Sequence, residues 1–94
     1  MDTKKKLKVN LENMNFVADG IYSNLLCPEC GQKKAEAFFS KHKSEKLYGV
    51  WFECHKCGNV EHISCGKKPD GFKAERISEK YQVLDERAWE FAGQ

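Results

Sequence analysis

Two copies of one short pattern, Cys-x-x-Cys-Gly, constrain the fold of this 94-residue chain more than any other feature. The copies are Cys27-Pro28-Glu29-Cys30-Gly31 and Cys54-His55-Lys56-Cys57-Gly58, and 23 residues separate Cys30 from Cys54. Each glycine allows a positive φ at the point where the chain leaves the cysteine loop. Two cysteines on such a tight loop reach one ion together, and thiolate sulfur suits tetrahedral zinc. The pattern predicts one structural Zn²⁺ bound by Cys27, Cys30, Cys54 and Cys57.

Other ligands and other uses of the cysteines are also possible. His55, His62 and Cys65 could compete for the metal, although Cys65 is expected to pack as a small hydrophobic residue. His42 is expected to be a solvated histidine. Disulfides are disfavoured, because five cysteines in a chain with no signal peptide point to metal binding. A rubredoxin-type iron site also uses two such pairs, so an electron carrier is a remote alternative.

The length and composition fit one small domain. Hydrophobic residues make up 40% of the chain and charged residues 32%, which is typical of a globular protein. A chain this short buries a modest core, so a disulfide, a metal or a partner is expected to help stabilise it. No apolar run reaches the roughly 20 residues that span a bilayer. The start, MDTKKKLKVN, lacks the apolar stretch of a signal peptide. We therefore expect a cytoplasmic protein without membrane contact.

The chain is expected to form a small α+β zinc-binding domain, and its first 26 residues are expected to be β structure. Leu7, Val9 and Leu11 alternate with polar residues, which is the period of a half-buried strand. Asp19-Gly20 is a strong turn signal between two apolar stretches. Residues 1–26 are therefore predicted to be an N-terminal β segment with a hairpin.

The remaining residues divide into a ribbon and a helix, which are expected to belong to the same compact domain. Residues 27–65 are expected to form a three-stranded antiparallel zinc ribbon, because two segments between the cysteine pairs and one after them favour strands. Residues 66–94 are expected to be a linker and a C-terminal helix. The helix prediction rests on apolar residues at steps of 4, 3, 4 and 3, with Gly93 at its end: Ile77, Tyr81, Leu84, Ala88 and Phe91. Its residues Ile77, Tyr81 and Leu84 are expected to be buried.

The segment CPECGQKKAEAFFSKHKSEKLYGVWFECHKCGNVEHISC resembles the zinc ribbons of transcription elongation factor TFIIS and related small RNA-polymerase subunits. The likeness covers residues 27–65 and rests on both cysteine pairs, on Phe38-Phe39 and on the aromatic strand before Cys54. It implies a three-stranded antiparallel sheet with zinc at one end. The family carries an acidic pair at its hairpin tip, whereas residues 41–46 read Lys-His-Lys-Ser-Glu-Lys here. One carboxylate among lysines is a poor magnesium site. The resemblance thus implies the fold and not transcript cleavage.

The functional prediction is a non-enzymatic binding module, because four cysteines leave zinc no open position for catalysis. We expect an accessory factor that contacts nucleic acid or a nucleic-acid-processing machine. The candidate contacts are lysines for phosphates and one tryptophan for base stacking: Lys33, Lys34, Lys41, Lys43, Lys46, Lys56 and Trp51. The alternative is a protein-interaction regulator or inhibitor without nucleic-acid contact. It is supported by an aromatic content of 12% and by a net charge of +2 that falls close to zero when zinc thiolates form.

Overall fold

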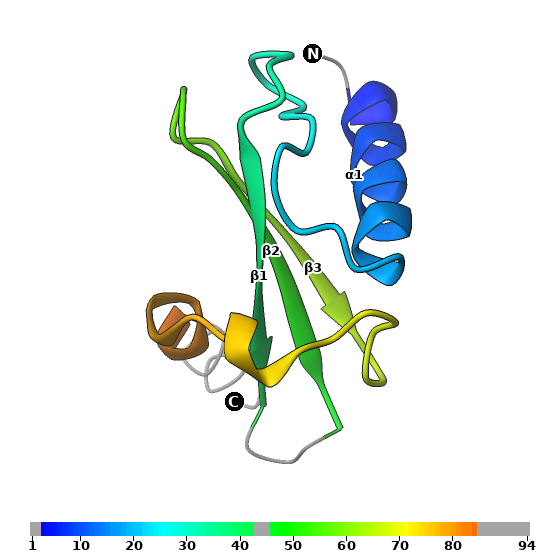
Figure 1. Cartoon of the computed structure of the whole chain (residues 1–94), viewed down its shortest axis with the longest axis vertical. Coiled ribbons are helices and arrows are strands. Elements are labelled where there is room, and N and C mark those ends of the chain that lie inside the picture. Colours follow the sequence, from blue (N-terminus) through cyan, green and yellow to red (C-terminus); the bar gives the residue numbers. More distant parts are fainter. Residues whose placement is uncertain (1–2, 43–45, 85–94) are drawn as a thin grey trace.

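Three antiparallel strands form the centre of the molecule in this computed structural model (Figure 1). The structure describes residues 3–42 and 46–84. The strands lie in the sheet in chain order, as two successive hairpins: β1 (Ala35–Lys41), β2 (Tyr48–Cys54) and β3 (Val60–Cys65). Aromatic and β-branched residues are frequent in them, and both types favour strands. The three-stranded antiparallel sheet predicted from the sequence is confirmed.

The register gives the sheet two distinct ends. Ala35 pairs with Cys54 where β1 begins and β2 ends, and we call this the cysteine end. Lys41 pairs with Tyr48 at the opposite end, which we call the tip end. Cys65 also pairs with Tyr48, so the last cysteine lies at the tip end. The first four cysteines and the fifth are therefore separated by the length of the strands.

The N-terminal segment is helical, so the β segment predicted for residues 1–26 is wrong. Helix α1 (Thr3–Ala18) buries Val9, Asn13 and Val17, which are spaced four residues apart and lie on one helix face. Lysine, leucine, glutamate and methionine make up most of its other residues, and these residue types favour helices. The alternating apolar residues that suggested a strand cover only five positions. The buried residues follow the 3.6-residue period of a helix instead.

The Asp19-Gly20 signal ends α1 and does not turn a hairpin. Gly20 has a φ of +83°, which is the left-handed conformation that glycine adopts easily. Its N–H donates to the carbonyl oxygen of Val17 at 2.9 Å, and the N–H of Ile21 donates to that of Phe16 at 2.9 Å. These two bonds form a Schellman motif, a common helix C-terminus. An Asp-Gly pair favours both kinds of turn, and the residues before it decide which one forms.

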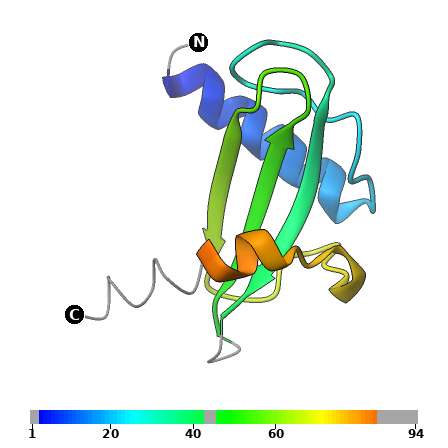
Figure 2. The same ribbon diagram turned by 90° about the vertical axis from the view of Figure 1, so that its left-hand side faces the viewer.

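Both faces of the sheet are covered by other parts of the chain. Figure 2 shows α1 behind the sheet and the helical residues 79–84 in front of it. The core on the α1 side consists of apolar residues from the helix end, the following loop and two strands: Val17, Leu25, Ala35, Ala37, Phe39, Val50 and Phe52. On the other side the ring of Tyr81 stacks on that of Trp51, with centroids 4.7 Å apart.

The chain after the sheet returns along the outer edge of β1. It passes through the short 3-10 helix η1 (Ala74–Arg76), and the N–H of Ser78 then donates to the carbonyl oxygen of Phe39 at 3.1 Å. The Arg76 guanidinium donates to the carbonyl oxygen of Ala37 at 2.8 Å. These contacts satisfy backbone groups that the edge of the sheet would otherwise expose.

The predicted C-terminal helix is observed over residues 79–84, and Ala88, Phe91 and Gly93 lie outside the described residues. Tyr81 is buried as expected, and Ile77 is half-buried against the core. Leu84 is 44% exposed, so its predicted burial is wrong. The ring of Tyr81, rather than an apolar stripe, packs the described part of this helix on the sheet. The Gln82 side-chain amide adds hydrogen bonds to both backbone groups of Lys41 in β1.

Candidate metal centre

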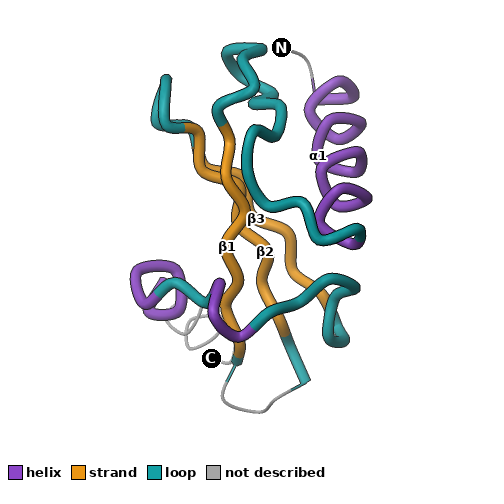
Figure 3. Tube along the Cα trace, in the orientation of Figure 1, coloured by secondary structure: helices purple, strands orange, loops and turns teal. Residues whose placement is uncertain are grey.

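The two cysteine pairs lie at the cysteine end, one in the loop before β1 and the other where β2 ends and the loop to β3 begins. Figure 3 shows these two loops side by side. Gly31 and Gly58 have φ values of +74° and +77°. The N–H of Gly31 donates to the carbonyl oxygen of Cys27 at 3.0 Å. In the second loop the N–H of Gly58 donates to the carbonyl oxygen of Cys54 at the same distance. A second bond repeats as well, from the N–H of each first cysteine to the carbonyl five residues later, at 2.9 Å. The two loops therefore share one backbone geometry.

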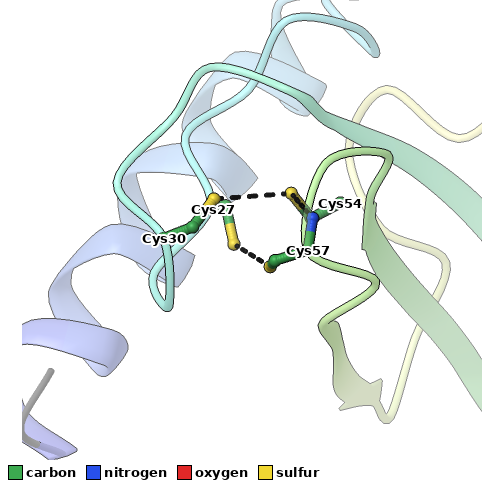
Figure 4. A group of neighbouring side chains, drawn as sticks. All are labelled: Cys27, Cys30, Cys54 and Cys57. Carbon is green, nitrogen blue, oxygen red and sulfur yellow. Dashed lines mark hydrogen bonds between the residues drawn. The ribbon is translucent and has the colours of Figure 1, made fainter.

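The structure brings together the four cysteines that the sequence grouped (Figure 4). Their sulfur atoms all lie within 4.8 Å of one another. The Sγ atoms of Cys27 and Cys57 are 3.6 Å apart, and those of Cys30 and Cys54 are 3.7 Å apart. A tetrahedral site with Zn–S bonds of about 2.3 Å separates its sulfurs by about 3.8 Å. The cluster thus fits a single metal ion of this size without rearrangement of the loops.

The loops also favour negative charge on sulfur. The N–H groups of Cys57 and Lys56 point to Sγ of Cys54, at 3.5 and 3.4 Å, and these hydrogen bonds lower the pKa of Cys54 to about 6. Burial has the opposite effect on Cys27 and raises its pKa to about 12 when no metal is bound. A cation beside Cys27 would stabilise its thiolate, and metal binding releases such protons.

Polar contacts from α1 position the first cysteine loop. The ammonium of Lys6 forms an ion pair with Glu29, which lies between the two cysteines of that loop. The side-chain N–H of Asn13 donates to the carbonyl oxygen of Leu26 at 2.8 Å, directly before Cys27. Sequence reasoning missed these residues because it assigned the segment to a strand. Lys6 and Asn13 are seven residues apart, which is two helical turns, so this spacing could have indicated that they share one helix face.

The other candidate metal ligands lie away from the four sulfurs. His55 belongs to the second cysteine loop, but its Nε2 lies 2.8 Å from a carboxylate oxygen of Glu36 in β1. The ring of His62 stacks on Trp51, with centroids 3.8 Å apart. Cys65 lies at the tip end, where burial raises the pKa of its thiol. Among the described residues, the metal-ligand group contains four cysteines and no histidine.

The lysines proposed as phosphate contacts do not form one surface. Three are exposed beside the cysteine end: Lys33, Lys34 and Lys56. Lys41 and Lys46 lie at the tip end, and Lys43 lies outside the described residues. Seven residues of strand rise about 3.3 Å each, so the two groups are separated by about 20 Å. A single phosphate backbone would have to run the length of the sheet to contact both.

Trp51, proposed as a base-stacking residue, is buried at 8% exposure, and the structure contradicts that role. Its ring lies between those of His62 and Tyr81, and its Nε1–H donates to Oγ of Ser40 at 2.9 Å. Trp51 lies on the opposite face of β2 from Val50 and Phe52, as strand alternation requires. The expected burial of Tyr81 is explained by its ring, which covers the face of the sheet that carries Trp51.

Comparison with protein families, with curated proteins and with solved structures gives no match to this chain. Within the described part of the chain, no helix combines the length and apolar character needed to cross a bilayer. The function therefore has to be inferred from the chemistry of the residues themselves.

Proposed function

We propose that the protein is a non-enzymatic zinc-ribbon module, with one structural Zn²⁺, that acts as an accessory factor of a nucleic-acid-processing complex. The observation that carries this proposal is the group of four cysteine sulfurs within 4.8 Å of one another, supplied by two loops of equal geometry. Four thiolates fill all positions of a tetrahedral ion, so no water or substrate position is left for catalysis. The metal then serves to fold and position the surrounding surface.

A nucleic-acid contact at the cysteine end is supported by the charges around it. Lys33, Lys34 and Lys56 are exposed there, and none of them lies in a regular strand or helix. Lysines in this arrangement can follow a phosphate backbone, which supplies most of the affinity of sequence-independent binding. The resemblance of residues 27–65 to transcription-factor ribbons agrees with this kind of partner, although it concerns the fold only.

A protein partner without nucleic acid is the second candidate, and a different observation favours it. Burial of Trp51 makes its ring inaccessible to unpaired bases. Leu7 and Leu11, in contrast, are 61% and 56% exposed one turn apart on α1. Exposed apolar residues in a row are typical of protein contacts and do not contribute to phosphate binding.

Salt-dependent binding of the zinc-loaded protein to single-stranded and duplex nucleic acid separates the two candidates. We expect the variant with Lys33→Ala, Lys34→Ala and Lys56→Ala to bind more weakly. Its plot of log K against log salt should be less steep by up to about 2.7 units, because each lost phosphate contact contributes about 0.9. Circular dichroism of the variant should match that of the parent protein.

A matched variant with Lys41→Ala and Lys46→Ala tests the tip end, where the other described candidate lysines lie. An effect of this pair alone would move the nucleic-acid surface to the tip. No detectable binding of the parent protein, or binding that neither set of lysines affects, would reject the nucleic-acid proposal and leave the protein partner.

A further inference from the structure

An apolar hollow of about 360 Å³ lies between α1 and the segment that follows it. Its apolar walls come from the last turns of the helix and from the loop before the first cysteine: Phe16, Ile21, Leu25 and Leu26. Phe16 and Ile21 remain 48% and 45% exposed, so the hollow opens to solvent. Ligand sites have volumes of about 300–1,000 Å³, and one bulky side chain fits at the lower end of that range.

A second hollow, of about 210 Å³, is lined by Glu12, Asn15, Phe16 and Asp19. It shares Glu12 and Phe16 with the larger hollow, so the two are neighbours around one aromatic ring. Glu12, Phe16 and Asp19 follow the spacing of one helix face, which places two carboxylates beside an exposed ring. Within residues 3–42 and 46–84, neither Glu12 nor Asp19 forms a salt bridge.

A purely structural explanation accounts for only part of this arrangement. A contact between Phe16 and Ile21 is the hydrophobic contact that usually accompanies a Schellman motif. It does not explain Asp19, because a carboxylate at the C-terminal end of a helix is repelled by the helix dipole and the last turn of α1 contains no basic residue.

The side chain of Asn13 leaves one hydrogen-bonding group without a partner. Its Nδ2 donates to the carbonyl oxygen of Leu26, but its Oδ1 is buried and accepts no hydrogen bond in the described structure. Because Oδ1 has almost no accessible surface, a ligand in the larger hollow does not reach it, and the docking surface consists of the apolar walls and the carboxylates.

We propose that these two hollows bind a short segment of a partner protein in which arginine or lysine adjoins a bulky apolar residue. The apolar side chain enters the larger hollow. The cation lies over the ring of Phe16 between Glu12 and Asp19, which combines cation–π and ionic contacts. Lys33 borders only the larger hollow and therefore orients the cation toward the smaller one. The inference rests on the proposed binding function and identifies a protein contact within it.

The test is an NMR titration of the zinc-loaded full chain with N-acetyl-tryptophanyl-arginine amide. We expect saturable shifts of backbone amides around the two hollows. The citrulline analogue has nearly the same shape without the charge and should bind about 3 to 10 times more weakly, as for one or two exposed ion pairs. N-acetyl-glycyl-arginine amide lacks the apolar group and should also bind more weakly.

The variants Glu12→Gln and Asp19→Asn keep the side-chain shape and remove the charge. Together they should reduce the affinity for the arginine peptide to that for the citrulline peptide, which itself should not change. Glu75→Gln with Glu79→Gln, two exposed acids elsewhere in the chain, is the matched control and should leave both affinities unchanged.

Absence of saturable shifts, equal affinities for the arginine and citrulline peptides, or an unchanged preference in the Glu12 and Asp19 variants would each overturn this proposal. Such a result with zinc bound and the nucleic-acid contact intact would leave the proposed function in place. Loss of zinc binding or of a folded spectrum in the parent protein would instead overturn the proposed function.

Discussion

The two ends of the sheet are held by different means. At the tip end the ring of Phe72 packs against those of Phe39 and Tyr48, with centroids 5.0 and 5.3 Å apart. At the cysteine end Cys54 pairs with Ala35, whose side chain is a single methyl group. Two loops with four sulfurs face each other beyond it. The core at this end includes Leu25 and Phe52 but no cluster of aromatic rings. In the proposed function a bound metal would add to the stability of this end, as is common in chains this short.

Metal removal should have the largest effect, because the proposed ion would join the two cysteine loops at their end of the sheet. Chelation, or Cys54→Ser, should unfold at least the sheet, since structural zinc contributes on the order of 10 kcal/mol and small domains have total stabilities of about that size. Circular dichroism and the melting temperature measure the loss.

Cys65→Ser is the matched control for Cys54→Ser, because it changes the same atom at the tip end. It should lower the free energy of unfolding by no more than about 1 kcal/mol and leave the zinc content unchanged. Equal losses for the two variants would mean that the ends do not differ in the way described.

Tyr81→Ala should have the next largest effect and should act on the aromatic packing alone. It removes the ring that stacks on Trp51, and replacing a buried aromatic residue by alanine destabilises by about 3 kcal/mol or more. Urea unfolding of the zinc-loaded protein gives the value, and zinc affinity should not change. Val83→Ala, at an exposed position of the same helical segment, should change stability by less than about 0.5 kcal/mol. A loss below 1 kcal/mol for Tyr81→Ala would contradict the role given to the stack.

Gly71→Ala tests how closely the loop after β3 approaches α1. Gly71 has a φ of +81°, and an added Cβ would lie 1.8 Å from the carbonyl oxygen of Val17. The substitution should lower stability by about 2 kcal/mol or more, through strain and overpacking together. Gly20→Ala has a similar φ but open space around it, so strain alone should reduce stability by about 1 kcal/mol. Thermal melts measure the stability of both variants. A larger loss for Gly20→Ala than for Gly71→Ala would contradict the close approach of this loop to α1.

Asn13→Ala should have the smallest effect of the series and concerns the link between α1 and the cysteine end. It removes the hydrogen bond to the Leu26 carbonyl next to Cys27, and a loss of about 1 kcal/mol is expected. Asn15→Ala, at an exposed position of the same helix, should change stability by less than about 0.5 kcal/mol. Identical denaturation curves for the two variants would show that the link does not stabilise the fold.

The cysteine end could be predicted from the sequence, because its geometry is local. Two residues between the cysteines and a glycine after them fix each loop, and the segments between and after the pairs have the composition of strands. The positions of Cys27, Cys30, Cys54 and Cys57 thus followed from short-range constraints.

The packing of α1 could not be predicted in the same way. Asn13 occupies the middle of its buried face, whereas Leu7 and Leu11 point to solvent, so the apolar residues do not mark the face that packs. The cover on Trp51 also depends on a segment about 30 residues later in the chain, whose direction after the turn is a tertiary property. Composition and period carry no information about such long-range contacts.

The central claim is that a metal with four sulfur ligands holds the cysteine end. X-ray absorption of the purified protein at the zinc edge tests it most directly, together with elemental analysis. The account predicts one zinc per chain, with four sulfur neighbours at about 2.3 Å and no nitrogen or oxygen neighbour. A shell with three sulfurs and one lighter ligand, or a folded protein that contains no metal, would contradict it.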